Sequence, residues 1–174
     1  MKITPLALSG VFLLEREPFV DERGSFERQF CLKELAQYGL DFTICQCNLS
    51  GNTRKYTLRG LHYQKAPYPE RKIVSCFSGR MLDVVVDVRP DSPTYLQHLS
   101  VELSAKNGKM LYIPPQMAHG FLTLEDDTTV YYQLSEFFHS EAYAGLRWND
   151  PKLNIQWPTN CPIINKRDNT YELL

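Results

Sequence analysis

The stretch Thr57–Lys72 reads Thr-Leu-Arg-Gly-Leu-His-Tyr-Gln-Lys-Ala-Pro-Tyr-Pro-Glu-Arg-Lys and carries a guanidinium (Arg59), an imidazole (His62) and an ammonium (Lys72). Its first part has the pattern of a strand, and its proline-rich part has that of a turn. One titratable base and two cations are what a site needs to remove a proton from an anionic substrate and to hold the charge that results. Because a single histidine in a sheet is more often packed or exposed than catalytic, the rest of the chain must decide between these readings.

Within this stretch, the strand pattern predicts how the imidazole is oriented. Alternate residues of an extended segment share a face, so His62 is expected to point the same way as Gly60 and Gln64. A glycine in a strand often marks a close approach of another group. We expect Gly60 to leave room beside the imidazole for a substrate.

The bulk properties limit the class of protein. The chain has 174 residues, of which 43% are hydrophobic, and we expect residues 1–174 to form a single domain. The formal net charge is −1, so the chain lacks the excess of positive charge that is typical of proteins that bind nucleic acids or anionic membrane surfaces. No apolar run is long enough to span a bilayer, and the N-terminus does not resemble a signal peptide. The five cysteines are odd in number and lack a CxxC spacing, which is typical of reduced, cytoplasmic residues.

Before and after the opening stretch, the pattern is mostly that of strands. Val11–Leu14 is expected to be an edge strand, and leucines at helical spacing predict a short helix at about residues 31–38, ended by Gly39. Phe42–Asn48 is rich in residues that favour strands, and Ser50–Lys55 has the composition of a polar loop.

Three later pairs of strand-like runs are separated by short polar segments, and each pair predicts a β-hairpin. The three turns are expected at Ser78–Arg80, at Ser104–Lys109, which contains Asn-Gly, and at Glu125–Asp127. Short strands at this density, with one or a few short helices and no internal repeat, indicate an all-β domain. We expect an antiparallel barrel or jelly roll.

Two polar residues fall on faces of these strands that are expected to be buried. Asp83 is expected inside, where a carboxylate needs a partner, and Lys72 and Arg59 are the candidates. Tyr132 lies on the apolar face of its strand, and a buried phenol also needs a hydrogen-bond partner. If that partner is a substrate, the tyrosine can act as an acid; if it is the backbone, Tyr132 is a core residue.

Taken together, the motifs resemble those of the dTDP-4-dehydrorhamnose 3,5-epimerases, a family of cupin-like jelly rolls that act on nucleotide-linked 4-keto-6-deoxy sugars. The resemblance covers nearly the whole chain and is specific only when the blocks are combined. The matching blocks are Asp21–Phe26, Leu58–Gln64, Lys72, Gly79–Arg89, Ser92–Thr94, Ile113–Pro114, Ala118–Phe121, Trp148–Pro151 and Trp157–Pro158.

The resemblance also implies a role for individual residues. His62 matches the family's general base, Asp168 the carboxylate that orients its imidazole, Tyr132 the acid on the opposite face of the sugar, and Lys72 the cation beside the enolate. It implies a homodimer as well, in which Arg23 reaches the partner's site. The residues expected to bind the nucleotide sugar are Arg23, Phe26, Arg28, Gln46, Asn48, Arg59, His119, Phe138, Tyr143 and Arg167.

The implied chemistry fits these side chains. The protons at C3 and C5 of a 4-keto sugar are both α to the ketone, so one base and one acid can invert a centre without any cofactor. A metal-binding cupin would need a His-x-His pair and a further histidine, but Gly60 stands where the first of these would be, and His62 and His119 alone remain. We therefore expect no metal.

Some positions depart from the family and leave alternatives open. Arg28 stands where the family usually has Glu, Phe138 where it has Tyr, and Tyr143 where it often has Glu. In the family, the corresponding positions contact the nucleotide and the outer sugar, so the resemblance leaves a CDP- or GDP-linked substrate as an alternative to dTDP-4-dehydro-6-deoxy-D-glucose. Related alternatives are a ketoisomerase and a single-centre epimerase. A carbohydrate-binding jelly roll without catalysis is a remote alternative, because it would not need His62, Tyr132 and Lys72 together.

Overall fold

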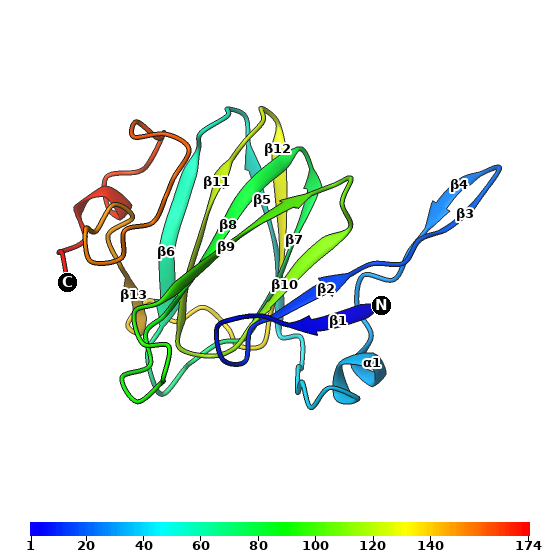
Figure 1. Cartoon of the computed structure of the whole chain (residues 1–174), viewed down its shortest axis with the longest axis horizontal. Helices are drawn as coiled ribbons and strands as arrows, with labels where there is room; N and C mark the ends of the chain where they lie inside the picture. The colour runs from blue at the N-terminus through cyan, green and yellow to red at the C-terminus, as the bar shows by residue number, and fades with distance from the viewer.

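The computed structural model describes residues 1–174 as two antiparallel sheets packed face to face, with a small hairpin projecting from them (Figure 1). One sheet has six strands in the order β1-β2-β10-β7-β12-β5, and the other has five in the order β13-β6-β11-β8-β9. The expected all-β jelly-roll sandwich is thus confirmed. The strands of the sandwich are β1 (Lys2–Pro5), β2 (Phe12–Glu15), β5 (Gln46–Asn52), β6 (Leu58–Gln64), β7 (Lys72–Ser78), β8 (Arg80–Asp87), β9 (His98–Ser104), β10 (Lys109–Ile113), β11 (Met117–Thr123), β12 (Thr128–Leu134) and β13 (Tyr143–Gly145).

Alternation of side chains along the strands builds layers on both sides of each sheet. On β8, Met81 and Val85 face the core between the sheets, whereas Val84 and Val86 face outward and are covered by the C-terminal segment. The helix α1 (Leu32–Ala36) and the loop after it cover part of the outer face of the six-stranded sheet. The C-terminal segment therefore lies against the sheet that contains β6.

The three predicted hairpins are wrong, because the strands on either side of each turn belong to different sheets. β7 and β8, β9 and β10, and β11 and β12 each cross from one sheet to the other. At the first crossing, Gly79 has φ 72°, and a Cβ there would lie 2.4 Å from Thr128 Oγ1. The turn residues were identified correctly, but a local pattern cannot tell a hairpin from a crossing between sheets.

Of the other expectations for the early elements, the helix is confirmed and two strand assignments need correction. The short helix is confirmed, with Gly39 at φ 70° after it. The expected edge strand at Val11–Leu14 is wrong in its place, since β2 lies between β1 and β10, and β1 forms the edge. The strand expected at Phe42–Asn48 begins later and extends to Asn52, into the predicted loop. No helix in the structure combines the length and the apolar character needed to cross a membrane.

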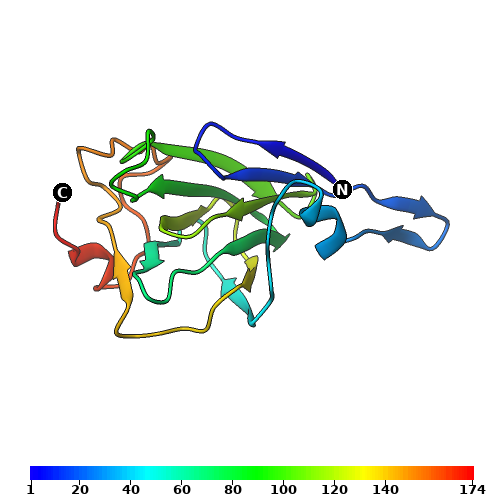
Figure 2. The same ribbon diagram turned by 90° about the horizontal axis from the view of Figure 1, so that it is seen from below.

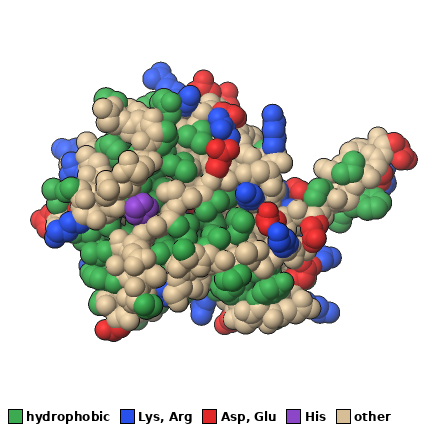
Figure 3. All heavy atoms as spheres, viewed as in Figure 1, with side chains coloured by type: hydrophobic (Ala, Val, Ile, Leu, Met, Phe, Trp, Pro, Cys, Tyr) green, Lys and Arg blue, Asp and Glu red, His purple; other side chains and the backbone are tan.

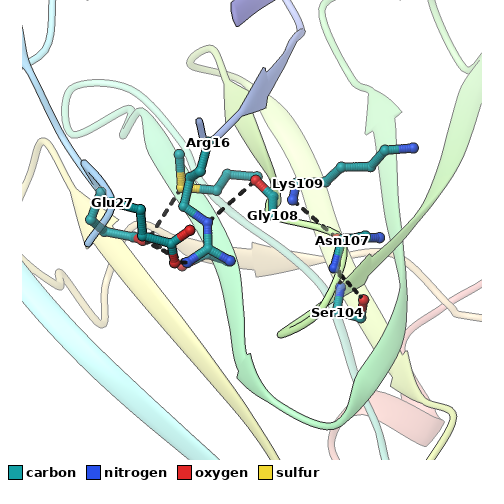
Figure 4. Close-up of polar contacts among 9 residues, drawn as sticks. Arg16, Glu27, Ser104, Asn107, Gly108 and Lys109 are labelled. Carbon is teal, nitrogen blue, oxygen red and sulfur yellow. Dashed lines mark hydrogen bonds and ion pairs between the residues drawn. The ribbon is translucent and has the colours of Figure 1, made fainter. Parts of the chain in front are cut away.

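Between β2 and α1, the chain forms an arm of two short strands, β3 (Phe19–Asp21) and β4 (Gly24–Phe26). The arm extends away from the sandwich at the end opposite to the C-terminal segment (Figures 1 and 2). Hydrophobic side chains are exposed on it (Figure 3), with Phe26 79% and Val20 68% accessible. At its base, Arg16 pairs with Glu27 and donates to the carbonyl of Gly108 (3.3 Å), which ties both ends of the arm to the sandwich (Figure 4).

Candidate active site

A cavity of about 720 Å³ opens between the two sheets, on the side where β5 faces β6 and β13. It brings together all four residues with a predicted catalytic role. It also contains seven of the ten predicted substrate-binding residues. The predicted site residues that line it are Gln46, Asn48, Arg59, His62, Lys72, His119, Tyr132, Phe138, Tyr143, Arg167 and Asp168.

The base predicted on β6 is bonded to the predicted carboxylate. His62 Nε2 lies 2.8 Å from Asp168 Oδ1, and the second oxygen of Asp168 accepts a hydrogen bond from the backbone N–H of Gly60 (3.1 Å). Asp168 begins the 3-10 helix η1 (Asp168–Thr170) and is fully buried, although it is far from His62 in the sequence. The C-terminal segment thus brings a buried carboxylate to the imidazole, which is the contact that the predicted roles of His62 and Asp168 require.

The pKa values of this pair favour a neutral imidazole. Burial lowers the pKa of His62, and the nearby Lys72 and Arg167 lower it further, against the raising effect of Asp168. Burial raises the pKa of Asp168, but hydrogen bonds from His62 and Gly60 outweigh it, so this pKa lies below its ordinary value. An ionised Asp168 takes the Nε2–H, which leaves Nδ1 of the imidazole as the basic nitrogen.

A bulge in β6 turns two site side chains, Arg59 and His62, toward the cavity. His62 is paired with His119 and Arg59 with Phe121, so two residues of β6 oppose the single Gly120 of β11. Alternation is therefore interrupted, and Arg59 and His62 both line the cavity. The expectation that His62 shares a face with Gly60 is wrong for this reason.

The role expected for Gly60 also needs correction. Its φ is 127°, and a Cβ there would lie 2.5 Å from the Cα of Gly120 and 2.9 Å from the carbonyl oxygen of His119. The missing side chain makes room for the backbone of β11 and not for a substrate. This close approach keeps the strand that carries His62 against the strand that carries His119.

Lys72, at the start of β7, is held by two protein acceptors. Its Nζ lies 2.8 Å from Glu70 Oε1 and donates to the carbonyl oxygen of His62 at 3.3 Å. Glu70 lines the cavity and was missed by the sequence reasoning. Its position two residues before Lys72 was a signal, because alternate residues of an extended segment share a face.

A second histidine–aspartate pair lies next to the first. His119 Nε2 is 2.7 Å from Asp83 Oδ1, and both side chains are buried. The expectation that Asp83 pairs with Lys72 or Arg59 is wrong, because β8 and β11 are neighbours and the imidazole of β11 lies within reach. The other oxygen of Asp83 is buried without a hydrogen-bond partner.

Tyr132 lies on the cavity wall formed by β12. Its ring is edge-on to that of His119, with centroids 6.1 Å apart. Burial, and then the charge of Asp83, raise the pKa of Tyr132 well above its ordinary value. The phenol of Tyr132 therefore stays protonated, as its predicted role as an acid requires.

Polar and aromatic side chains complete the wall around this centre. Arg59 Nε donates to Asn52 Oδ1 at 2.9 Å, and the side chains of Gln46 and Asn48 contact each other at 3.1 Å on β5. The ring of Tyr143 lies 5.0 Å from that of His62 and 5.3 Å from that of Phe138. The guanidinium of Arg167 lies over the Tyr143 ring, 4.7 Å from its centroid.

The remaining predicted residues lie away from the cavity. Arg23 and Phe26 are on the projecting arm, where Arg23 pairs with Asp21 at 2.5 Å. Arg28 pairs with Glu34 of α1. No group of three or more His, Cys, Asp or Glu side chains is arranged to hold a metal ion.

Comparison with known proteins gives a consistent result. Residues 5–174 match the family model described as dTDP-4-dehydrorhamnose 3,5-epimerase. A dTDP-4-dehydrorhamnose 3,5-epimerase from Sinorhizobium fredii is 39% identical over 175 residues, which cover 100% of this chain and 90% of the relative. The Shigella flexneri enzyme of the same name is 37% identical over 169 residues, covering 97% and 93% of the two chains.

Solved structures agree with these relatives. A dTDP-4-dehydrorhamnose 3,5-epimerase from Bacillus anthracis, with TDP and pyrophosphate bound, has a TM-score of 0.97 and 37% identity, and 99% of each chain is covered. A 3′-monoepimerase from Streptomyces bikiniensis in complex with dTDP-quinovose has a TM-score of 0.92 and 31% identity. That match covers 98% of this chain and 86% of the other.

Proposed function

The chain belongs to the dTDP-4-dehydrorhamnose 3,5-epimerase family, and from that premise we propose how its cavity carries out the reaction. The protein is an isomerase that epimerises a nucleotide-linked 4-keto-6-deoxy sugar in deoxysugar biosynthesis. The substrate under this proposal is dTDP-4-dehydro-6-deoxy-D-glucose, and the product is dTDP-4-dehydro-L-rhamnose. A relative from Legionella pneumophila has been solved in complex with dTDP-4-keto-L-rhamnose.

In the proposed mechanism, two side chains move protons and a third holds charge. The neutral imidazole of His62 removes the proton from C3 or C5, and the electrons of the broken C–H bond form an enolate whose charge lies on the C4 oxygen. Lys72 stabilises that oxygen, and such a contact contributes about 10²–10³-fold to the rate. Tyr132 then donates its proton to the carbon from the opposite face, which inverts the centre. Proton exchange with solvent returns His62 and Tyr132 to their starting states.

The observation that carries this proposal is the contact between His62 and Asp168 at the cavity wall (2.8 Å). A carboxylate on one ring nitrogen leaves the other nitrogen basic and stabilises the imidazolium that forms during abstraction. The same cavity holds Lys72 and Tyr132. A binding protein without catalysis would need none of these arrangements.

Deuterium exchange tests the proposal directly. The enzyme is incubated with dTDP-4-dehydro-6-deoxy-D-glucose in D₂O, and deuterium at C3 and C5 is read by NMR. We expect incorporation at the inverted centres, with product formed at a matching rate. Absence of both incorporation and product would contradict the proposal.

The number of inverted centres is a separate point. One base and one acid can serve both carbons, and the Streptomyces bikiniensis relative is a 3′-monoepimerase. A single-centre epimerase is therefore the second candidate. In the same NMR experiment it would place deuterium on C3 and none on C5.

For the nucleotide, we propose dTDP, held in part by Arg59 at the diphosphate. The guanidinium of Arg28 pairs with Glu34, so it is occupied within its own protomer. Arginine has only donors and cannot accept the hydrogen bond that a glutamate would take from thymine. Calorimetry with dTDP, CDP, GDP and UDP, on wild type and Arg28→Glu, tests the choice: preference of wild type for CDP or GDP would overturn it.

We also propose that the protein is a homodimer in which the arm completes the partner's site. Arg23 is on the arm, 82% exposed, at the end of the molecule opposite to the segment that carries Asp168 (Figures 1 and 2). It cannot serve its own cavity from there. Its exposed aromatic neighbours Phe19 and Phe26 fit a buried contact better than a solvated one.

Complementation between variants tests the shared site. Arg23→Ala and His62→Ala are each expected to be weakly active, and a mixture of the two is expected to regain activity, because one site of the mixed dimer is intact. Light scattering at micromolar concentration is expected to give twice the monomer mass. A fully active monomer would rule the arrangement out.

Finally, we propose that residues 1–174 act as one domain in the cytoplasm, with neither a nucleic acid nor a membrane as partner. The net charge of −1 and the five free cysteines support this reading. Limited proteolysis tests the domain assignment, since a single domain is expected to resist cleavage within the sandwich. Cell fractionation tests the location.

A further inference from the structure

The contact between Glu70 and Lys72 is a feature of the cavity that the proposed mechanism does not use. The two side chains are 10% and 9% exposed, and Nζ lies 2.8 Å from Oε1. An ammonium has three N–H donors. Glu70 takes one, and the carbonyl oxygen of His62 takes another at 3.3 Å. One donor is left for a ligand.

The position of Glu70 is unfavourable on electrostatic grounds alone. A carboxylate next to the cation that holds an enolate opposes the negative charge developing there. The other carboxylate of the cavity, Asp168, belongs to His62. With Glu70 beside it, Lys72 stabilises a developing negative charge less well than an unpaired ammonium would. Glu70 must therefore contribute something other than charge stabilisation.

Geometry supplies that benefit. A lysine has a flexible four-carbon stem, and its ammonium is a point charge without directional preference of its own. A fixed acceptor on each side of Nζ removes that freedom before the substrate arrives. Groups that are fixed in advance stabilise a transition state better than groups that must reorganise.

We propose that Glu70 is a positioning residue, which fixes the ammonium of Lys72 so that its remaining N–H is presented to the C4 oxygen of the sugar. This inference rests on the proposed function, because it assumes that Lys72 stabilises the enolate. It predicts that the acceptor oxygen of residue 70 matters more than its charge.

Two substitutions separate these properties. Glu70→Gln keeps the acceptor oxygen and the length of the side chain, whereas Glu70→Ala removes both oxygen and charge. We expect Glu70→Ala to lower kcat by about 10–100-fold, as for a misplaced catalytic group, with KM little changed. Glu70→Gln is expected to recover most of that loss. Glu15→Gln, which breaks a lysine–glutamate pair outside the cavity (3.4 Å to Lys2), is the control.

The pH profile gives a second readout. The charged groups that act on His62 are Asp168, Lys72 and Arg167, and the rings of Tyr143 and Tyr171 pack against it. Glu70 is close to Lys72 and also acts on Tyr143. Loss of its negative charge leaves more positive charge near His62, which disfavours the imidazolium. The acid limb of kcat/KM is therefore expected to move to lower pH in both Glu70 variants.

A double substitution shows whether Glu70 acts through Lys72. If it does, Glu70→Ala in a Lys72→Ala background is expected to cause no further loss of kcat, so the two effects are not additive. Additive losses, a Glu70→Gln variant as impaired as Glu70→Ala, or a Glu70→Ala variant with the kcat of wild type would each overturn the proposal. These outcomes all require an active wild type, so failure of the proposed function itself would be seen first, as absence of exchange in the unsubstituted enzyme.

Discussion

Two histidine–aspartate pairs, His62–Asp168 at the cavity wall and His119–Asp83 reaching behind it, are alike in their contacts and unlike in their surroundings. His62 and His119 face each other across β6 and β11, and each Nε2 lies close to an aspartate oxygen, at 2.8 Å and 2.7 Å. In the first pair, both oxygens of Asp168 have partners, and His62 is 17% exposed. In the second, one oxygen of Asp83 has no partner, and His119 is 4% exposed.

From this difference we infer that the two histidine–aspartate pairs have different roles in the proposed reaction. In the proposed reaction, the more exposed His62–Asp168 pair (the open pair) can exchange a proton with a substrate through Nδ1, while the hydrogen bonds to both oxygens of Asp168 keep the carboxylate in place. The His119–Asp83 pair (the enclosed pair) lies beside Tyr132, and the charge of Asp83 contributes to the raised pKa of that phenol. The following predictions test this division.

Substitution of the open histidine is expected to have the largest effect. His62→Ala removes the base, so deuterium uptake at both carbons and product formation should fall by at least about 10²–10⁴-fold. His98→Ala, on β9 away from the cavity, is the control and should keep the wild-type rate. Exchange at a near wild-type rate in His62→Ala would show that another group is the base.

Tyr132→Phe separates the two faces of the sugar. Without the hydroxyl, inversion should fall by about 10²-fold or more, while His62 can still remove a proton and return one to the same face. We expect deuterium to enter with retained configuration, as read by NMR. Full epimerisation by this variant would refute the two-face mechanism; Tyr38→Phe, on the surface, is the matched control.

Asp168→Asn should impair the open pair in two ways. Loss of the carboxylate removes a group that raises the pKa of His62, so the acid limb of kcat/KM should move to lower pH. The amide no longer holds the imidazole in one tautomer, and kcat should fall by about 10–100-fold, as when a catalytic group is slightly misplaced. An unshifted acid limb would argue against the pair; Asp91→Asn is the surface control.

Asp83→Asn is expected to have a smaller effect on stability than Asp168→Asn. Asp168→Asn endangers the hydrogen bond from the Gly60 N–H, and a buried donor left unpaired costs about 1–3 kcal/mol. The free oxygen of Asp83 has no such partner to lose, so the cost there should stay below about 1 kcal/mol. Urea unfolding compares the two variants, and the reverse order would contradict the comparison.

The open pair should also leave a signature in the pH dependence of stability. The pKa of His62 is below its ordinary 6.5 in the folded protein, so the unfolded chain binds the proton more readily. The contribution of neutral His62 to the free energy of unfolding is therefore at its maximum above pH 6.5, and it is lost as the pH falls through the pKa that His62 has in the folded protein. The lowered pKa of Asp168 acts in the same direction below its ordinary 3.8. Each pKa unit corresponds to about 1.4 kcal/mol, and His62→Ala should remove the first of these two losses.

Most strands, the turns and several candidate site residues could be predicted from the sequence, because these features depend on local patterns of side chains. Alternating side chains identified most strands, and Gly39 and Gly79 marked real ends and corners. His62 and Lys72 were recognisable because they lie within blocks that match the family, and Tyr132 because a phenol on the apolar face of a strand needs a partner. Local patterns also separated the two faces of β8, on which Asp83 was correctly expected to point inward.

Tertiary structure decided which of these elements meet. The turn sequences at 78–80, 104–109 and 125–127 do not encode whether the next strand pairs with the last or joins the opposite sheet, because that depends on which distant faces bury each other. For the same reason Asp83 contacts His119 instead of Lys72, and a bulge in β6 lets Arg59 and His62 both line the cavity. Asp168 reaches the cavity because the C-terminal segment covers the apolar outer face of the sheet containing β6, and that packing carries its side chain to the imidazole of His62.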